Sequence, residues 1–225
     1  MKSPCHFADR QEAAELLASK LQTYRGRNPL VLAIPRGAVP MAKIIADRLQ
    51  GELDVVLAHK LGAPFSREYA IGAVVEGGWT YLAPETEAMG ISPSYIEREK
   101  AQQLDVIHQR RERYTPFRQP INAKGRVVII VDDGLATGAT MIAALHAIRT
   151  QNPAELVCAV PVAAPDSLEK VRPLADTVVC LGAPDDFQAV GQFYNHFLQV
   201  EDEEVVTLLM PPVGKKADAP ASPSP

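Results

Sequence analysis

The chain has 225 residues, enough for one domain or two small ones, and 47% of them are hydrophobic. Its formal net charge of −4 argues against a nucleic-acid coat or a polybasic membrane binder, because both need an excess of cationic side chains. The composition also excludes a chain that is disordered throughout.

Helix and strand patterns alternate from the start of the chain. Apolar residues at helical spacing predict a helix over 9–24, with Asp9 as its N-cap. A short apolar run predicts a strand at 30–34, and the amphipathic stretch 39–49 predicts the next helix. Two further strands are expected, at 54–58 and at 70–76.

The second half of the chain continues this alternation. A long charged segment without Gly or Pro predicts an exposed helix over 94–114, and its Arg110, Arg111 and Arg113 are expected on a solvated face. Apolar runs predict strands at 127–131, 156–160 and 177–181, and a helix is expected over 138–150. Continuous apolar strands separated by helices are typical of an α/β protein whose mostly parallel sheet is flanked by helices.

The last fifteen residues differ from the rest. Residues 211–225 contain five of the nineteen prolines and no apolar face, which predicts a disordered Pro/Ala/Ser tail after a single domain over 1–210. The three cysteines form no CxxC pair, and Cys158 and Cys180 lie in apolar runs, as expected of buried thiols in a reducing compartment. No secretory or membrane-spanning segment is recognisable, so a cytoplasmic protein is expected.

The segment from Val127 to Thr140 carries the clearest chemical signal. A strand ends in two adjacent acids, Asp132 and Asp133, and the small or hydroxylated residues Ala136, Thr137, Gly138, Ala139 and Thr140 lead into a helix. The unpaired N–H groups of such a helix start, with two hydroxyls, can hold a phosphate. The acids would repel an anion unless they accept hydrogen bonds from hydroxyls or face a divalent cation. A sugar phosphate satisfies both demands, whereas the alternative is an ordinary turn with an N-cap threonine.

A second loop at the same edge of the sheet offers cationic groups. Arg36 and Gly37 follow the strand at 30–34, where the guanidinium can grip a phosphate and the glycine lets the backbone approach it. Lys60 follows the predicted strand at 54–58 and is expected along the same edge as a phosphate counter-charge. The alternative is that both cations are exposed on ordinary connections.

Other motifs are missing or weak. The chain has no GxxxxGK[ST], GxGxxG or GxSxG sequence, and its five histidines lack the spacing of a metal site. The aromatic residues within 187–197 predict core packing at the C-terminal side, with a lid over a planar base as the alternative.

The stretch from Val127 to Thr140 resembles the phosphoribosyl pyrophosphate (PRPP) motif of the type I phosphoribosyltransferase family. The resemblance implies a flavodoxin-like core with a small hood, and a homodimer. It implies that Asp132 and Asp133 bind the ribose hydroxyls and that residues 136–140 bind the 5′-phosphate. Arg36 and Gly37 resemble the family's pyrophosphate loop.

The activity expected from this resemblance is transfer of ribose 5-phosphate between PRPP and a nitrogenous base, of purine type, with release of pyrophosphate. Asp133, as a candidate proton acceptor, and Arg36 and Lys60, as counter-charges, are the expected catalytic residues. Mg²⁺ is the expected cofactor, held by PRPP, with Asp132 and Asp133 contacting it through water and no direct protein ligand. The alternative is a catalytically silent PRPP sensor on the same fold. One departure is the helix expected at 94–114, where many members carry a β-hairpin with a catalytic loop.

Overall fold

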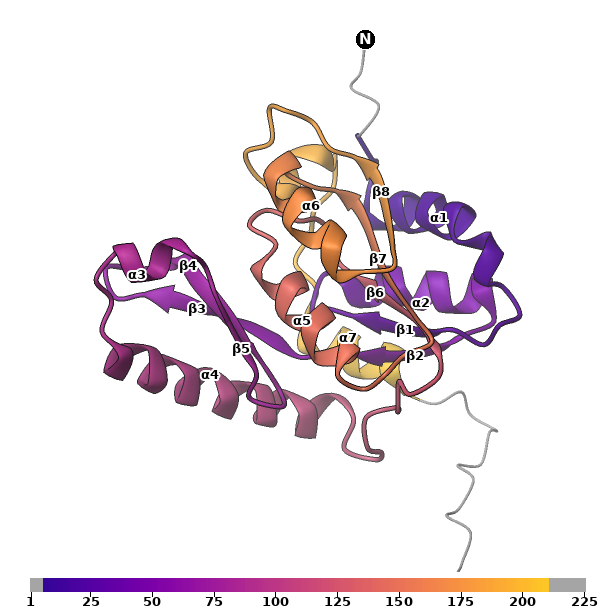
Figure 1. Cartoon of the computed structure of the whole chain (residues 1–225). Coiled ribbons are helices and arrows are strands. Elements are labelled where there is room, and N and C mark those ends of the chain that lie inside the picture. Colours follow the sequence, from indigo (N-terminus) through magenta and orange to yellow (C-terminus); the bar gives the residue numbers. More distant parts are fainter. Residues whose placement is uncertain (1–5, 211–225) are drawn as a thin grey trace, which may run out of the picture.

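The central sheet of the computed structural model has five parallel strands in the order β2-β1-β6-β7-β8 (Figure 1). The structure describes residues 6–210, so Cys5 and the predicted tail 211–225 lie outside the described residues. The strands are β1 (Leu30–Ala33), β2 (Glu52–Val55), β6 (Val127–Val131), β7 (Glu155–Val162) and β8 (Thr177–Gly182). This is the doubly wound flavodoxin-like order, in which the chain turns in opposite directions from β1 and from β6.

Helices cover both faces of this sheet, as the continuous apolar runs predict. The helices α1 (Arg10–Lys20) and α2 (Ala38–Leu49) pack on one face, and α5 (Ala139–Arg149) and α6 (Pro165–Val171) pack on the other. Alternate residues of each strand point to opposite faces, so Val31 and Ile129 belong to the first core and Leu32 and Ile130 to the second. The predicted N-cap is confirmed, because the side chain of Asp9 accepts a hydrogen bond from the Glu12 N–H at 3.0 Å.

A second, antiparallel sheet stands to one side of the core with two helices and is the small added unit that the sequence predicted (Figure 1). It consists of β3 (Ala58–Ala63), β4 (Ser66–Val75) and β5 (Thr80–Leu82), followed by α3 (Glu85–Ala88) and α4 (Pro93–Tyr114). The single strand predicted at 54–58 is therefore wrong: β2 ends at Val55, and Ala58 begins β3 in the other sheet. The helix predicted at 94–114 is confirmed, and a β-hairpin is present as well.

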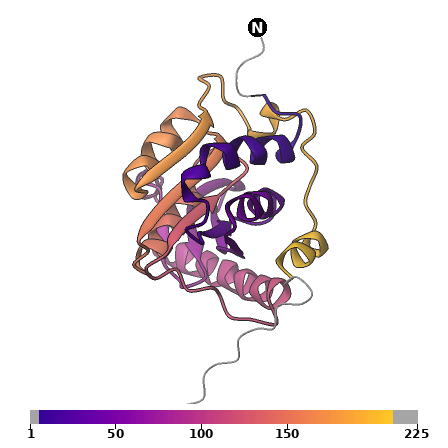
Figure 2. The same cartoon turned by 90° about the vertical axis from the view of Figure 1, so that its right-hand side faces the viewer.

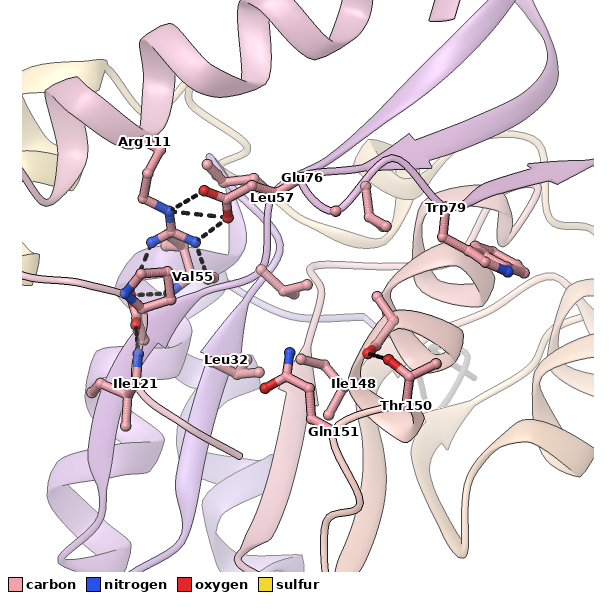
Figure 3. Close-up of a pocket in the computed structure, with 16 residues that line it drawn as sticks. Leu32, Val55, Leu57, Glu76, Trp79, Arg111, Ile121, Ile148, Thr150 and Gln151 are labelled. Atoms are coloured by element: carbon pink, nitrogen blue, oxygen red, sulfur yellow. Dashed lines mark hydrogen bonds and ion pairs between the residues drawn. The ribbon is translucent and has the colours of Figure 1, made fainter. Parts of the chain in front are cut away.

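The solvated face predicted for the arginines of α4 is wrong for Arg111. Its side chain is only 13% exposed. The guanidinium donates to both carboxylate oxygens of Glu76, with Nη2–Oε2 at 2.8 Å, and to the Val55 carbonyl oxygen at 3.1 Å (Figure 3). Arg111 also lies 3.4 Å from the buried carboxylate of Asp54. The arginine thus joins α4 to the edge of the core and to β4.

The start of the described chain pairs with a segment that precedes α7. Phe7 pairs with Tyr194 in a parallel bridge, and the Phe7 N–H donates to the Phe193 carbonyl oxygen at 2.8 Å. From the 3₁₀ turn Val190–Phe193 the chain runs beside α1 and α2 to α7 (Asp202–Leu209) (Figure 2). Phe193 and Tyr194 are buried, which confirms core packing for this part of the aromatic segment.

Candidate active site

Two loops leave the carboxyl ends of neighbouring strands at the point where the strand order reverses. The 35–37 loop lies between β1 and α2, and the 132–140 loop, which includes the first two residues of α5, follows β6. Because β1 and β6 pair in parallel, both loops lie at the same edge of the sheet. Ligands of doubly wound proteins bind in the crevice at this position.

The 132–140 loop presents a row of unpaired backbone N–H groups. Gly138 has a φ of 76°, a left-handed conformation that side chains disfavour, and it directly precedes α5. Within the described residues, the N–H groups of Thr137, Gly138, Thr140 and Met141 have no hydrogen-bond partner. The Ser167 hydroxyl donates to the Ala136 carbonyl oxygen at 2.6 Å and anchors the loop to α6. The loop therefore offers free N–H groups at a helix start, an arrangement that can bind an anion.

Each carboxylate of the acid pair keeps one oxygen available. Oδ1 of Asp132 accepts from the Asp133 N–H at 2.9 Å, and Oδ2 of Asp133 accepts from Arg10. Asp132 Oδ2 and Asp133 Oδ1 have no hydrogen-bond partner in the part of the chain that the structure describes. Since no buried side-chain oxygen of the described residues lacks a partner, these two oxygens are open to solvent. They can accept hydrogen bonds from two hydroxyl groups of a ligand.

The folded structure disfavours the charged forms of Asp132 and Asp133. Burial raises the pKa of Asp132 well above its usual range, and the charge of Asp133 raises it further, while Lys60 and Arg10 oppose the shift. Burial also raises the pKa of Asp133, and the charge and hydrogen bonds of Arg10 oppose it. The fold thus holds two acids where their charged forms are disfavoured, which is common at functional sites.

Two residues that no sequence pattern singled out hold Asp133. Arg10 donates to Asp133 Oδ2 from Nε at 2.9 Å and from Nη2 at 2.7 Å. The Tyr194 hydroxyl donates to the Asp133 carbonyl oxygen at 2.7 Å. Asp9 and the aromatic segment 187–197 marked the neighbourhood of these residues, but no sequence pattern pointed from either to Asp133.

A cavity of about 240 Å³ gathers most of the predicted site residues. Among the predicted residues, those that line it are Lys60, Asp132, Asp133, Ala136, Thr137, Gly138 and Thr140. Lys60 lies in β3 of the small sheet, so the small sheet closes one wall of this cavity. Val190 closes another wall and packs so near Gly134 that a Cβ there would lie 2.6 Å from Val190 Cγ1.

Three predicted residues do not line this cavity. Ala139 is buried at the start of α5 against Ala58 and Ala73 of the small sheet. The Arg36 guanidinium lies 3.6 Å from Glu201 and 3.8 Å from Asp202 at the start of α7. Gly37 lies beside Asp133, where its missing side chain makes room for the carboxylate.

Replacement of Gly37 by Ala should disturb the acid pair without unfolding the protein. A Cβ at this position would overlap Asp133 Oδ2 and lie 3.0 Å from Arg10 Nη2, so the carboxylate and the guanidinium that holds it must shift. We expect a loss of about 1–3 kcal/mol in the free energy of unfolding, measured by urea denaturation. Gly77→Ala is the control, because nothing lies within 4 Å of a Cβ there. Equal stability of the two variants would contradict the contact.

The model of the phosphoribosyl transferase domain family matches residues 8–196 of this chain. The chain belongs to the phosphoribosyl transferase domain family. The matched span contains both loops of the site, the small sheet and Tyr194.

Relatives extend over most of this phosphoribosyl transferase domain protein. A Mycobacterium tuberculosis H37Rv protein, provisionally named as a phosphoribosyl transferase, is 40% identical over 204 residues, which are 90% of this chain and 46% of that protein. The chain therefore spans about half the length of the curated relatives that it matches first. The crystal structure of TT1426 from Thermus thermophilus is 47% identical, with a TM-score of 0.77 over 91% of this chain and 97% of that one. A ribose-phosphate pyrophosphokinase of Streptomyces coelicolor is 25% identical over 138 residues, 56% of this chain and 42% of that protein.

Two searches of residues 6–210 bear on the surroundings of the site. No described helix combines the length and the apolar character needed to cross a membrane. No group of three or more His, Cys, Asp or Glu side chains within these residues is arranged to hold a metal ion.

Proposed function

We propose that this phosphoribosyl transferase domain protein binds PRPP and transfers its ribose 5-phosphate group to a nitrogenous base, with release of pyrophosphate. The observation that carries the proposal is the cavity in which an anion cradle, two carboxylates with available oxygens and the Lys60 ammonium meet. The 5′-phosphate of PRPP matches the N–H groups of the cradle, its ribose hydroxyls match the carboxylates, and its pyrophosphate matches the Lys60 ammonium. The family match supports the proposal.

The proposed roles of the residues follow from their positions. The free N–H groups of Thr137, Gly138, Thr140 and Met141 bind the 5′-phosphate, with the hydroxyls of Thr137 and Thr140 as further donors. Oδ2 of Asp132 and Oδ1 of Asp133 accept hydrogen bonds from the two ribose hydroxyls and hold the ring still while the bond at C1′ breaks. Oδ1 of Asp133 is also the oxygen of that residue that is free to accept a proton from the incoming base.

The departing pyrophosphate needs positive charge. Lys60 lines the cavity from the small sheet and supplies one charge directly. Arg36 supplies a second charge if it leaves Glu201 and Asp202, and its present distances of 3.6 and 3.8 Å to them exceed those of a strong charge-assisted hydrogen bond. Gly37 lets the 35–37 loop pack against Asp133 and so lie beside the cavity.

Mg²⁺ fits this donor set as an ion brought in by the substrate. The acid pair offers two available carboxylate oxygens, which suits hydrogen bonding to metal-bound water, and oxygen atoms of PRPP complete the coordination that Mg²⁺ prefers. When bound, the ion neutralises charge that develops on the pyrophosphate. A purine-type acceptor, a homodimer and a cytoplasmic location stay predictions from the sequence.

The decisive measurement is pyrophosphate release from PRPP in the presence of Mg²⁺ and a panel of purine and pyrimidine bases. We expect release that depends on one of the bases, together with PRPP binding by calorimetry. PRPP binding without release in any mixture would favour the sensor alternative. A folded protein that neither binds PRPP nor releases pyrophosphate would refute the proposal.

A further inference from the structure

All three guanidinium nitrogens of Arg10 donate a hydrogen bond at or beside the acid pair. Nε and Nη2 both donate to Asp133 Oδ2, and Nη1 donates to the Leu198 carbonyl oxygen at 2.6 Å. The guanidinium carbon lies 3.8 Å from the centre of the Phe197 ring, so the flat face of the group is covered as well. The side chain is only 14% exposed. A planar group with hydrogen bonds and a stacking partner has one orientation.

The backbone of Arg10 is fixed as firmly as its side chain. It is the first residue of α1, directly after the N-cap Asp9, and α1 buries Ala13, Ala14 and Leu17 against the core. On the other side of Asp133, Tyr194 holds the backbone carbonyl of the acid. The arginine from the start of the chain and the tyrosine from its C-terminal side therefore clamp the same acid.

We propose that Arg10 is a positioning residue for sugar binding: by holding Oδ2 of Asp133 it aims Oδ1 at a ribose hydroxyl. The inference rests on the proposed function, because the proposed function makes a ribose hydroxyl the ligand of Asp133 Oδ1. Gly37 supports it, since the absence of a side chain there makes room for Asp133 Oδ2 where Arg10 holds it. Arg10 acts through Asp133 and does not line the cavity itself.

If Arg10 had only a structural role, the expected result would be different. An arginine that only ties the two chain ends together would, when removed, loosen the site as a whole and weaken every ligand by a similar factor. A positioning residue should affect the recognition of the sugar hydroxyls and leave the binding of the phosphate unchanged. Three ligands separate these cases: ribose 5-phosphate, 2-deoxyribose 5-phosphate and 3-deoxyribose 5-phosphate.

The experiment measures the dissociation constants of the three sugar phosphates by calorimetry for the wild type and for the Arg10→Gln variant. In the wild type, removal of the hydroxyl that faces Asp133 should weaken binding about 10-fold or more, as for a hydrogen bond to a charged group. In Arg10→Gln that penalty should fall below about 3-fold, and the affinity for the sugar phosphate lacking this hydroxyl should stay near the wild-type value. Arg10→Lys should recover part of the penalty, because it keeps the charge and loses the fork.

Arg48→Gln is the matched control. Arg48 also contacts α1, through Glu15 at 2.8 Å, but it is 59% exposed and lies on another surface. All three dissociation constants should equal those of the wild type. If Arg10→Gln does not fold, Arg10→Lys carries the test, and its penalty must then be smaller than that of the wild type.

The outcomes separate the inference from the proposed function. A hydroxyl penalty that is unchanged in the Arg10 variants, or an equal loss for all three ligands, would overturn the positioning role. A folded wild type that binds none of the ligands, or binds all three equally, would instead refute sugar recognition by the acid pair and so the proposed function.

Discussion

The Asp132→Asn variant should lose on the order of 100-fold in pyrophosphate release, the effect of removing a hydrogen bond to a charged group in a closed site. Its melting temperature should stay equal to that of the wild type or rise. Burial and the neighbouring Asp133 raise the pKa of Asp132, so its charged form destabilises the folded state. Asparagine removes this charge and keeps an oxygen for the Asp133 N–H, which now lies 2.9 Å from Asp132 Oδ1.

The wild type and Asp132→Asn should also differ in how their stability depends on pH. An acid whose pKa is higher in the folded than in the unfolded state favours folding at low pH, and that contribution is lost as the pH rises through the folded pKa. The wild type should therefore lose more stability than Asp132→Asn between mildly acidic and mildly alkaline pH, in thermal melts of both proteins. A variant that is strongly destabilised at every pH but retains activity would show that Asp132 is structural.

Asp133→Asn is the informative companion. It removes the carboxylate that Arg10 holds with two donors, so a guanidinium that is only 14% exposed loses its counter-charge. We expect both activity and melting temperature to fall, in contrast to Asp132→Asn. Equal stability of the two single variants would contradict the difference that the structure shows between the two acids.

The Asp54→Ala variant should lose about 3 kcal/mol or more in the free energy of unfolding, the effect of breaking a buried ion pair. Asp54 is 1% exposed and accepts hydrogen bonds from Arg118 Nη1 at 2.8 Å and from the Ile121 N–H at 2.9 Å. Arg111 Nη1 lies 3.4 Å from Asp54 Oδ1. Arg111 also lines a second cavity, together with Val55 and Glu76 (Figure 3). Removal of Asp54 takes a negative charge away from the largely buried guanidinium groups of Arg111 and Arg118.

Urea denaturation measures this loss, with Asp47→Ala as the control. Asp47 also pairs with a cation, Lys43, but its side chain is 62% exposed, so we expect a change within about 1 kcal/mol. If Asp54→Ala were as stable as Asp47→Ala, the network around Asp54 would contribute nothing to the joint between α4 and the core.

The core of the fold was predictable because its signals are local. Strands buried on both faces give unbroken apolar runs, and β1, β6 and β7 match the runs seen in the sequence. The half-buried edge strand β8 also matches its run. The same signal failed at 54–58, where the apolar residues Val56 and Leu57 connect two sheets without any change in composition. The buried side of α4 was missed because Arg111 contacts Glu76, 35 residues away.

In the candidate site, too, the parts marked by a local sequence pattern could be predicted, and the contacts between distant residues could not. The acids and the loop that leads into α5 lie within one continuous segment, so their spacing could be recognised. Lys60 lines the cavity, although the strand assigned before it was wrong. Arg10 is 123 residues from Asp133 and Tyr194 is 61 residues away, and no local pattern marks either contact.

The clamp on Asp133 also bears on the order in which the molecule assembles. Arg10 and the Leu198 carbonyl that it binds are 188 residues apart, among the longest loop closures in the described chain. All five strands of the central sheet precede residue 183, so during synthesis the sheet can form before Leu198 has left the ribosome. Until then the clamp on Asp133 is incomplete, and the part of the candidate site around the acid pair is completed last. A nascent chain halted before Tyr194 should therefore have the sheet but not the finished site.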